Sequence, residues 1–193
     1  MSIQPHQPAR VLQSKTPEKV DLSAIVIETP RLILKPVSLD YAEVVFKSFT
    51  PAVARYTFPR SPEKIEETIG FITGSIESSQ IGVGVDLLIL NRKTGEFCGL
   101  CGLSGQNDTR NPEFGVWLAE SAHGNGFGKE AIVYLRLWAI ANLDVDGFLY
   151  PVDRNNIASR RIPESLNGVV IDEQIKPTMS GGTLDCLIYR ISN

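Results

Sequence analysis

The sequence predicts an α+β domain in which a mixed β-sheet carries helices on both faces. Of its 193 residues, 42% are apolar and 21% are charged, which suits one globular domain with a sizeable core. Segments with strand and helix character follow one another in the order strand, two helices, three strands, helix, strand, helix, two strands. That order fits neither an all-parallel nor an all-antiparallel sheet, so a mixed sheet is the simplest arrangement.

The single domain is predicted to span residues 25–193. Residues 1–24 contain three prolines, many polar side chains and no hydrophobic periodicity. Such a segment buries little apolar surface, so we expect a disordered N-terminal tail outside the fold.

The first half of the domain is predicted to contain three strands and two helices. Alternating apolar residues over 24–37 indicate one strand with a bend. Ser38 can cap a short helix, and Pro62 stands in the first turn of a longer one. Two apolar runs over 82–105 are joined by Asn91–Gly95, which is a hairpin signal. The expected core residues of the two helices are Tyr41, Val44, Val45, Phe49, Ile65, Ile69, Ile72 and Ile76.

The second half is predicted to contain two helices and four strands. The segment 127–143 is apolar on most sides, so its helix should be buried. A second helix over 155–168 should end at Asn167–Gly168, and Pro163 inside it should break or bend it. The strands of this half are expected over 111–119, 147–152, 168–175 and 183–192.

The charge balance argues against several classes of partner. A net charge of -3 and a pI near 5.5 lack the basic footprint that nucleic acids and anionic membranes require. The most apolar segment is interrupted by Arg136 and is too short to span a bilayer. We therefore expect neither a nucleic-acid nor a membrane partner.

The cysteines indicate a reducing compartment and no metal site. Three cysteines cannot all pair, and the N-terminus shows no secretory apolar segment, so a cytoplasmic protein is expected. Cys98 and Cys101 form a C-x-x-C, but a spacing of three should point them to opposite faces of a strand. With two histidines and no clustered ligands in the sequence, we expect no metal.

The segment AHGNGFGKEA, residues 122–131, places glycines at alternate positions between a predicted strand and a predicted helix. Glycines there leave the first N–H groups of the helix open to a ligand, and the helix dipole attracts phosphate. A P-loop is excluded because Glu130 follows Lys129, and a dinucleotide fingerprint would need glycine at 129. A phosphate cradle and a merely flexible turn both remain open.

Four segments together resemble the GNAT superfamily of N-acetyltransferases. HGNGFGKEA resembles its acyl-CoA signature Q/R-x-x-G-x-G/A, with His123 where glutamine or arginine is usual. IETPRLILKPVSLDYAEVVF resembles the opening strand and helix of the branch that contains the ribosomal-protein alanine (Rim) acetyltransferases. NPEFGVWLA is similar to that branch's E-x-G-Y-W-L strand, and VDRNNIASRRIPESLNG to its N-x-x-S-R-R helix. The resemblance covers residues 25 to about 170 in the family's order.

The resemblance implies a mostly antiparallel mixed sheet, the GNAT-like acyltransferase fold. Its fourth and fifth strands should splay apart and hold the pantetheine arm of acetyl-CoA, the implied cosubstrate. Backbone groups of Trp117 and Leu118 would contact the arm, while Asn156 and Ser159 would lie near the thioester. The residues implied to hold the diphosphate are His123, Gly124, Asn125, Gly126, Phe127 and Gly128.

Acetyl transfer to an amine needs a neutral nitrogen, a donor to the oxyanion and a proton for the leaving thiolate. Glu113 is the candidate base because in a strand it shares a face with Trp117; an ordinary strand-edge carboxylate is the alternative. Ser159 matches the serine of N-x-x-S and is the candidate acid, with Tyr150 in reserve. A backbone N–H near Leu118 can meet the oxyanion.

The expected function is acetyl-CoA-dependent N-acetyltransfer, directly from the thioester to a primary amine of a protein N-terminus or a small molecule. The alternative is a non-catalytic acyl-CoA-binding sensor or scaffold, which would share the glycines and differ at Glu113. Glu66 and Glu67, on the second predicted helix, are expected to attract the cationic amine. We expect a monomer or a homodimer.

Overall fold

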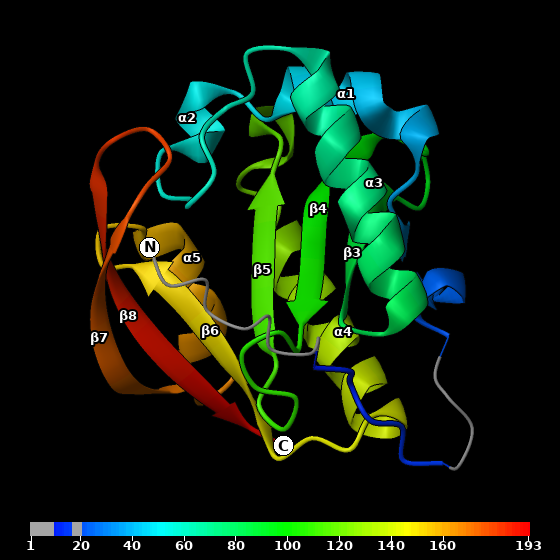
Figure 1. Ribbon diagram of the computed structural model, residues 1–193, viewed down its shortest axis with the longest axis vertical. Coiled ribbons are helices and arrows are strands. Elements are labelled where there is room, and N and C mark those ends of the chain that lie inside the picture. Colours follow the sequence, from blue (N-terminus) through cyan, green and yellow to red (C-terminus); the bar gives the residue numbers. More distant parts are fainter. Residues whose placement is uncertain (1–9, 17–20) are drawn as a thin grey trace, which may run out of the picture.

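A computed structural model of the chain describes residues 10–16 and 21–193. These residues form an eight-stranded sheet in the order β1-β2-β3-β4-β5-β6-β8-β7 (Figure 1). Every neighbouring pair is antiparallel except β5 and β6, which confirms the predicted mixed, mostly antiparallel sheet. The strands are β1 (Ile27–Glu28), β2 (Leu32–Pro36), β3 (Gly84–Asn91), β4 (Phe97–Ser104), β5 (Glu113–Leu118), β6 (Gly147–Asp153), β7 (Val169–Pro177) and β8 (Thr183–Ser192).

Helices cover both faces of the sheet, as predicted. α1 and α3 pack on one face, and α4 and α5 pack on the other (Figure 1). No helix among the described residues is long and apolar enough to cross a membrane. The helices are α1 (Ala42–Ser48), α2 (Pro51–Ala54), α3 (Ile65–Ile81), α4 (Phe127–Asn142) and α5 (Ile157–Glu164).

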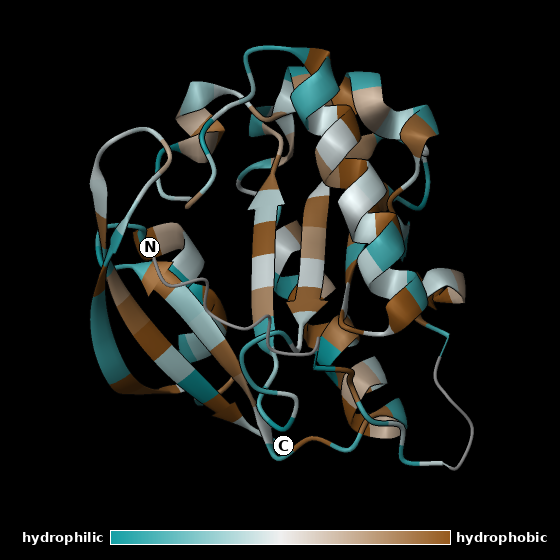
Figure 2. Cartoon of the chain, viewed as in Figure 1, coloured by the Kyte–Doolittle hydropathy of each residue, from teal (hydrophilic) through white to brown (hydrophobic). Residues whose placement is uncertain are grey.

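The period of two in the strands divides the core between these faces. In β3, Leu87 and Ile89 join the cluster under α4, whereas Leu88 and Leu90 join the cluster under α3. Figure 2 shows hydrophobic residues recurring along the central strands β4 and β5, with paler positions between them. The sheet is therefore buried on both faces at its centre.

Strands β5 and β6 form a fork. They share a single paired position, Glu113 opposite Leu149, and then diverge (Figure 1). The rings of Phe114 and Phe148 stack at this point with their centroids 4.6 Å apart, and both side chains are buried. The splay of the fourth and fifth predicted strands is thus confirmed.

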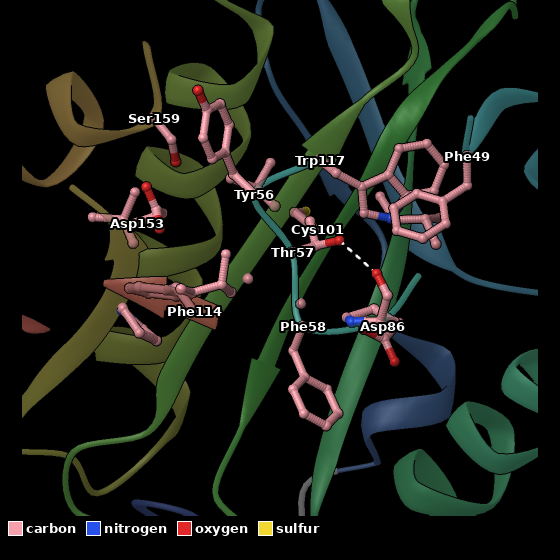
Figure 3. A pocket seen from close by; sticks show the side chains of 18 of the residues that line it. Phe49, Tyr56, Thr57, Phe58, Asp86, Cys101, Phe114, Trp117, Asp153 and Ser159 are labelled. Carbon is pink, nitrogen blue, oxygen red and sulfur yellow. Dashed lines mark hydrogen bonds between the residues drawn. The ribbon is translucent and has the colours of Figure 1, made fainter. Parts of the chain in front are cut away.

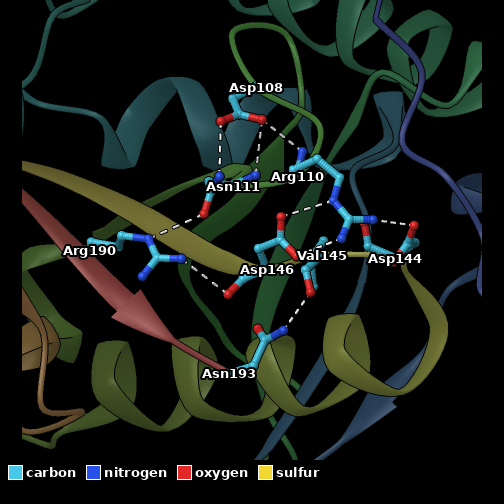
Figure 4. A network of polar contacts seen from close by, with 8 residues as sticks. All are labelled: Asp108, Arg110, Asn111, Asp144, Val145, Asp146, Arg190 and Asn193. Atoms are coloured by element: carbon cyan, nitrogen blue, oxygen red, sulfur yellow. Dashed lines mark hydrogen bonds and ion pairs between the residues drawn. The ribbon is translucent and has the colours of Figure 1, made fainter.

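A polar network holds the closed end of the fork (Figure 4). The Arg110 guanidinium forms ion pairs with Asp144 and Asp146, and its backbone carbonyl accepts the N–H of Asp146 at 2.7 Å. The hydrogen bond from Arg110 holds the pKa of Asp146 below its usual range. Arg190 in β8 donates to the backbone carbonyl of Asp146 at 3.3 Å. The loops before β5 and β6 are therefore joined to each other and to β8.

The predicted single strand over 24–37 is wrong, because β1 and β2 form a hairpin. Ile27 pairs with Leu34 across it. The turn is closed by Thr29, whose side-chain oxygen accepts the N–H of Leu32 at 2.7 Å. Thr29–Pro30 therefore reverses the chain instead of bending it.

The predicted tail is also wrong where the structure describes it. Leu12 is 6% exposed and Leu22 is 1% exposed, and both belong to the core under α4. The N–H of Leu12 bonds the carbonyl of Gly82 at 2.8 Å, and Ser14 bridges to Leu143. Residues 1–9 and 17–20 lie outside the described residues.

Two helix boundaries differ from the prediction. α3 begins at Ile65 instead of Pro62, because the Glu67 carboxylate accepts the N–H groups of Glu63 and Lys64 ahead of the first turn. Pro163 lies in the last turn of α5, which ends one residue later. α2, which begins at Pro51, was not predicted.

The expected opposite orientation of Cys98 and Cys101 is wrong as well. The register between β3 and β4 shifts at Ile89/Leu90, where Phe97 and Gly99 are paired and Cys98 is the extra residue. This bulge turns Cys98 to the α4 side of the sheet, where Cys101 also lies. All three cysteines are free and buried.

We expect Phe148→Ala to lower the free energy of unfolding by about 3–5 kcal/mol, because it empties a fully buried site beside the ring of Phe114. Urea denaturation followed by circular dichroism measures the change. The control, Leu137→Ala on the exposed side of α4, should change stability by no more than about 0.5 kcal/mol. Equal effects of the two variants would contradict this account of the fork.

Candidate active site

A cavity of about 550 Å³ opens at the fork between β5 and β6 (Figure 3). Its floor is formed by β3, β4, β5 and β6, and α5 contributes Asn156 and Ser159. Residues 56–60, between α2 and α3, lie over the cavity, and the Phe58 carbonyl accepts the N–H of Met179 from the β7–β8 hairpin at 3.1 Å. The cavity is therefore enclosed by elements from both halves of the chain.

The glycine segment forms the turn into α4. Gly124 and Gly126 have φ values of +75° and +73°, in the left-handed region that favours glycine. Gly126 is the N-cap of α4, so the N–H groups of Phe127, Gly128 and Lys129 have no acceptor within the helix or elsewhere in the described part of the chain. These donors and the helix dipole suit a phosphate group.

Arg31 and Glu130 fix this turn to the β1–β2 hairpin. The Arg31 guanidinium pairs with the Glu130 carboxylate at 2.6 Å, donates to the Asn125 carbonyl at 3.0 Å and lies over the Phe127 ring. Burial alone would raise the pKa of Glu130, but hydrogen bonds from Thr29 and Arg31 outweigh it and lower the pKa. The loop is thus held by contacts that leave its N–H groups free.

The side chain of His123 is hydrogen-bonded to the end of β5. Its Nε2 lies 3.0 Å from the carbonyl oxygen of Leu118, to which it donates a hydrogen bond. The residue therefore connects the glycine turn to the open end of β5. A Cβ at Gly128 would lie 3.7 Å from the Leu118 side chain, so the start of α4 packs directly on β5.

Glu113 and Trp117 lie on the same face of β5, as the sequence predicts, and this is the face that α3 covers. The Trp117 ring packs against Phe49, with centroids 4.8 Å apart, and against Phe97 at 5.8 Å. Burial raises the pKa of Glu113, and the nearby Lys176 partly opposes that rise. Glu113 thus combines access to the cavity with a basicity above that of an exposed carboxylate.

The two candidate acids lie in contact with each other. The hydroxyl groups of Tyr150 and Ser159 are 2.8 Å apart. Burial raises the pKa of Tyr150 to about 12, so its hydroxyl is protonated near neutral pH. The Asn156 side chain caps α5 by accepting the N–H of Ser159 at 3.2 Å.

The structure groups the expected residues into two sets. Glu113, Trp117, Tyr150, Asn156 and Ser159 line the cavity. The second set is the turn before and into α4, and it contains His123, Gly124, Asn125, Gly126, Phe127 and Gly128. Leu118 stands between the sets at the end of β5. Among the described residues, no group of three His, Cys, Asp or Glu side chains could hold a metal ion.

Residues 31–168 match the family described as acetyltransferase (GNAT) domain. The chain belongs to the GNAT acetyltransferase family. Because the match covers most of the chain, it confirms the resemblance seen in the four sequence segments. No curated protein matches the chain by sequence.

Solved structures show the same fold at low identity. RimL, a ribosomal L7/L12 alpha-N-protein acetyltransferase in complex with coenzyme A, is 18% identical, with 87% of this chain and 98% of that chain covered and a TM-score of 0.77. An acetyltransferase from Salmonella typhimurium that modifies the N-terminal serine of a ribosomal protein is 18% identical, with coverages of 88% and 99% and a TM-score of 0.75. A GCN5-related N-acetyltransferase from Brucella melitensis is 13% identical, with coverages of 94% and 82% and a TM-score of 0.75.

Several cavity residues were not identified from the sequence. Asp86 lines the floor from β3, where its neighbours are apolar and its polarity was the available signal. Lys176 reaches the cavity from the β7–β8 hairpin. Tyr56 and Phe58 come from the segment before α3, which the sequence left without a structural assignment.

We expect Lys176→Met to raise the pKa of Glu113, because the positive charge of Lys176 favours the ionised carboxylate and its removal leaves burial unopposed. NMR titration of the side-chain carboxyl carbons measures the shift. The control is Lys129→Met, at an exposed position of α4 outside the cavity lining, which should leave the Glu113 titration unchanged. An unchanged or lower pKa in Lys176→Met would contradict the assigned interaction.

Proposed function

We propose that this GNAT protein transfers an acetyl group from acetyl-CoA directly to a primary amine. The observation that carries the proposal is the fork between β5 and β6, because Glu113 lines its cavity and the glycine turn into α4 packs against the other end of the same strand, β5. A candidate phosphate cradle and a candidate base therefore lie along one strand that borders the gap in the sheet.

The chain offers a place for the diphosphate and for the pantetheine arm of the coenzyme. The diphosphate fits the free N–H groups at the start of α4, where no Cβ stands on Gly124 or Gly126. The pantetheine arm fits the open side of β5, where Trp117 and Leu118 have no strand partner on the β6 side. When bound, acetyl-CoA supplies an activated acetyl thioester.

Glu113 is the proposed base and Ser159 the proposed acid. Glu113 takes a proton from the attacking nitrogen as the nitrogen–carbon bond forms, and Ser159 gives a proton to the departing thiol sulfur as the carbon–sulfur bond breaks. Tyr150 can return a proton to Ser159 through their 2.8 Å contact. A backbone N–H near Leu118 stabilises the oxyanion.

The acceptor amine decides how much the base contributes. An α-amine with a pKa near 8 is about one-tenth neutral at pH 7, whereas a lysine amine near 10.4 is neutral in less than about one part in a thousand. The names of the structural relatives favour a protein N-terminus, and a small-molecule amine fits the enclosed cavity.

The direct test incubates the purified chain with acetyl-CoA and a panel of N-terminal peptides and small amines, and follows products by mass spectrometry. Products heavier by one acetyl group, with matching release of coenzyme thiol, support the proposal. Binding of acetyl-CoA without transfer to any acceptor would favour a non-catalytic acyl-CoA sensor or scaffold instead.

We expect Glu113→Gln to lower kcat by about 10²- to 10⁴-fold, the usual contribution of a general base. The affinity for acetyl-CoA should not change, because Glu113 lies outside the glycine turn. Thiol release at saturating substrates and calorimetry measure these two quantities. Glu77→Gln, at an exposed position of α3 outside the cavity lining, is the control. Full activity in Glu113→Gln would remove Glu113 as the base.

We expect Gly126→Ala to weaken coenzyme A binding by about tenfold. An alanine in the left-handed region is strained by about 1–2 kcal/mol. A change in the shape of the turn would relieve this strain but would move the N–H groups away from the phosphate, which lowers the affinity. Calorimetry with coenzyme A measures the affinity. The matched control is Gly74→Ala in α3, where a Cβ meets nothing within 4 Å, and which should stabilise the fold by about 0.5–1 kcal/mol. Unchanged affinity in Gly126→Ala would contradict the cradle.

A further inference from the structure

Asp86 lies on the floor of the cavity, on the same face of the sheet as Glu113. In β3 it alternates with Val85 and Leu87, which point to the core under α4. Asp86 is partly buried, and its side chain lines the cavity (Figure 3). It is therefore a deep carboxylate that still faces open space.

A row of glycines connects Asp86 to the fork. Asp86 pairs with Gly102 in β4, and Gly102 pairs with Gly115 in β5, so the three residues form one row across the sheet. A Cβ at Gly102 would lie 2.6 Å from Oδ1 of Asp86, which shows that the carboxylate leans over Gly102 toward β5. A Cβ at Gly115 would meet nothing within 4 Å. Strands are about 4.8 Å apart, so the row spans roughly 10 Å and ends at the gap.

Asp86 has no cationic partner among the described residues. Burial raises its pKa, and a side-chain hydrogen bond with Ser75 partly opposes that rise. Arg60, at the mouth of the cavity, is paired with Glu63 and Glu67. A buried carboxylate without a counter-charge is costly, and a cation arriving from the cavity would remove that cost.

The walls near Asp86 are aromatic. Phe58 and Phe71 are 55% and 45% exposed at the cavity mouth, and Trp117 lies toward the fork. Exposed aromatic rings beside a deep carboxylate suit a ligand with a cationic head and an apolar body. Glu67 already forms an ion pair with Arg60. Asp86 is therefore a better candidate than Glu66 and Glu67 for attracting the cationic amine.

We propose that Asp86 binds the ammonium group of the acceptor, and that the acceptor is a primary amine on a compact aromatic or branched apolar group. The role of this amine as the acceptor rests on the proposed acetyl transfer, whereas the binding of an amine at Asp86 does not. A nitrogen held by Asp86 above the glycine row stands beside the gap in the sheet, on the face from which Glu113 also reaches it. Asp86 thus selects and places the amine that Glu113 deprotonates.

The test uses 2-phenylethylamine as the probe and its neutral analogue 2-phenylethanol. Calorimetry is carried out on the full chain saturated with coenzyme A, and tryptophan fluorescence, to which Trp117 in the cavity lining contributes, gives a second signal. Asp86→Asn should weaken binding of the amine by about 10- to 100-fold, because one charge-assisted hydrogen bond is lost. Binding of coenzyme A and of 2-phenylethanol should not change. In steady-state kinetics the KM for the amine should rise far more than kcat falls.

Two further variants separate position from charge and from folding. Gly102→Ala keeps the carboxylate of Asp86, but the added methyl group would occupy the space in which that carboxylate lies. This variant should therefore also lower the affinity for the amine. Asp40→Asn, at an exposed site outside the cavity lining, makes the same chemical change and should have no effect. Thermal melts show whether each variant is folded under the assay conditions.

Equal affinity of the wild type and Asp86→Asn for 2-phenylethylamine would overturn the inference, as would equal binding of the amine and the alcohol. Faster acetylation of spermidine than of 2-phenylethylamine would contradict the inference that the acceptor carries an apolar group. Amine binding that depends on Asp86 without any acetyl transfer would support the site and contradict the proposed function, so the two failures are distinguishable.

Discussion

The separation of β5 from β6 after one paired position is the constraint on which the rest of the structure depends. Each strand beyond that position has backbone groups without a partner across the gap, and a buried unpaired group costs about 1–3 kcal/mol. The fold sustains the gap because its closed end is held strongly: Phe114 stacks on Phe148, and Arg110 joins the loops that precede both strands. The open backbone is then available to a ligand.

The sites proposed for the two substrates lie on different faces of the sheet. The glycine turn belongs to the α4 side, where Arg31 and Glu130 hold it against the β1–β2 hairpin. Asp86 and Glu113 belong to the α3 side, beneath the aromatic mouth of the cavity. In the proposed arrangement, a coenzyme and an amine would reach the fork from opposite faces, which suits direct transfer between two substrates bound together.

Periodicity was enough to predict the central strands and α4, because these elements depend on local patterns, whereas the splayed pair was implied by the resemblance to the GNAT superfamily. Contacts between distant residues were not accessible. Leu12 and Leu22 occur in a polar, proline-containing segment, and only their packing under α4 shows that they belong to the core. Asp86 interrupts an otherwise apolar strand, but its meaning depends on Gly102 and Gly115, which follow 16 and 29 residues later and become neighbours through strand pairing.

The burial of the cysteines has a chemical consequence for the reaction. Thiolates attack thioesters readily, and Cys101 lines the cavity in which the acetyl thioester is proposed to bind. Burial raises the pKa of Cys101 far above neutrality, and the pKa values of Cys98 and Cys186 are also raised. The enzyme's own sulfur atoms therefore stay protonated and do not trap the acyl group in a dead-end adduct, so the incoming nitrogen meets no internal competitor.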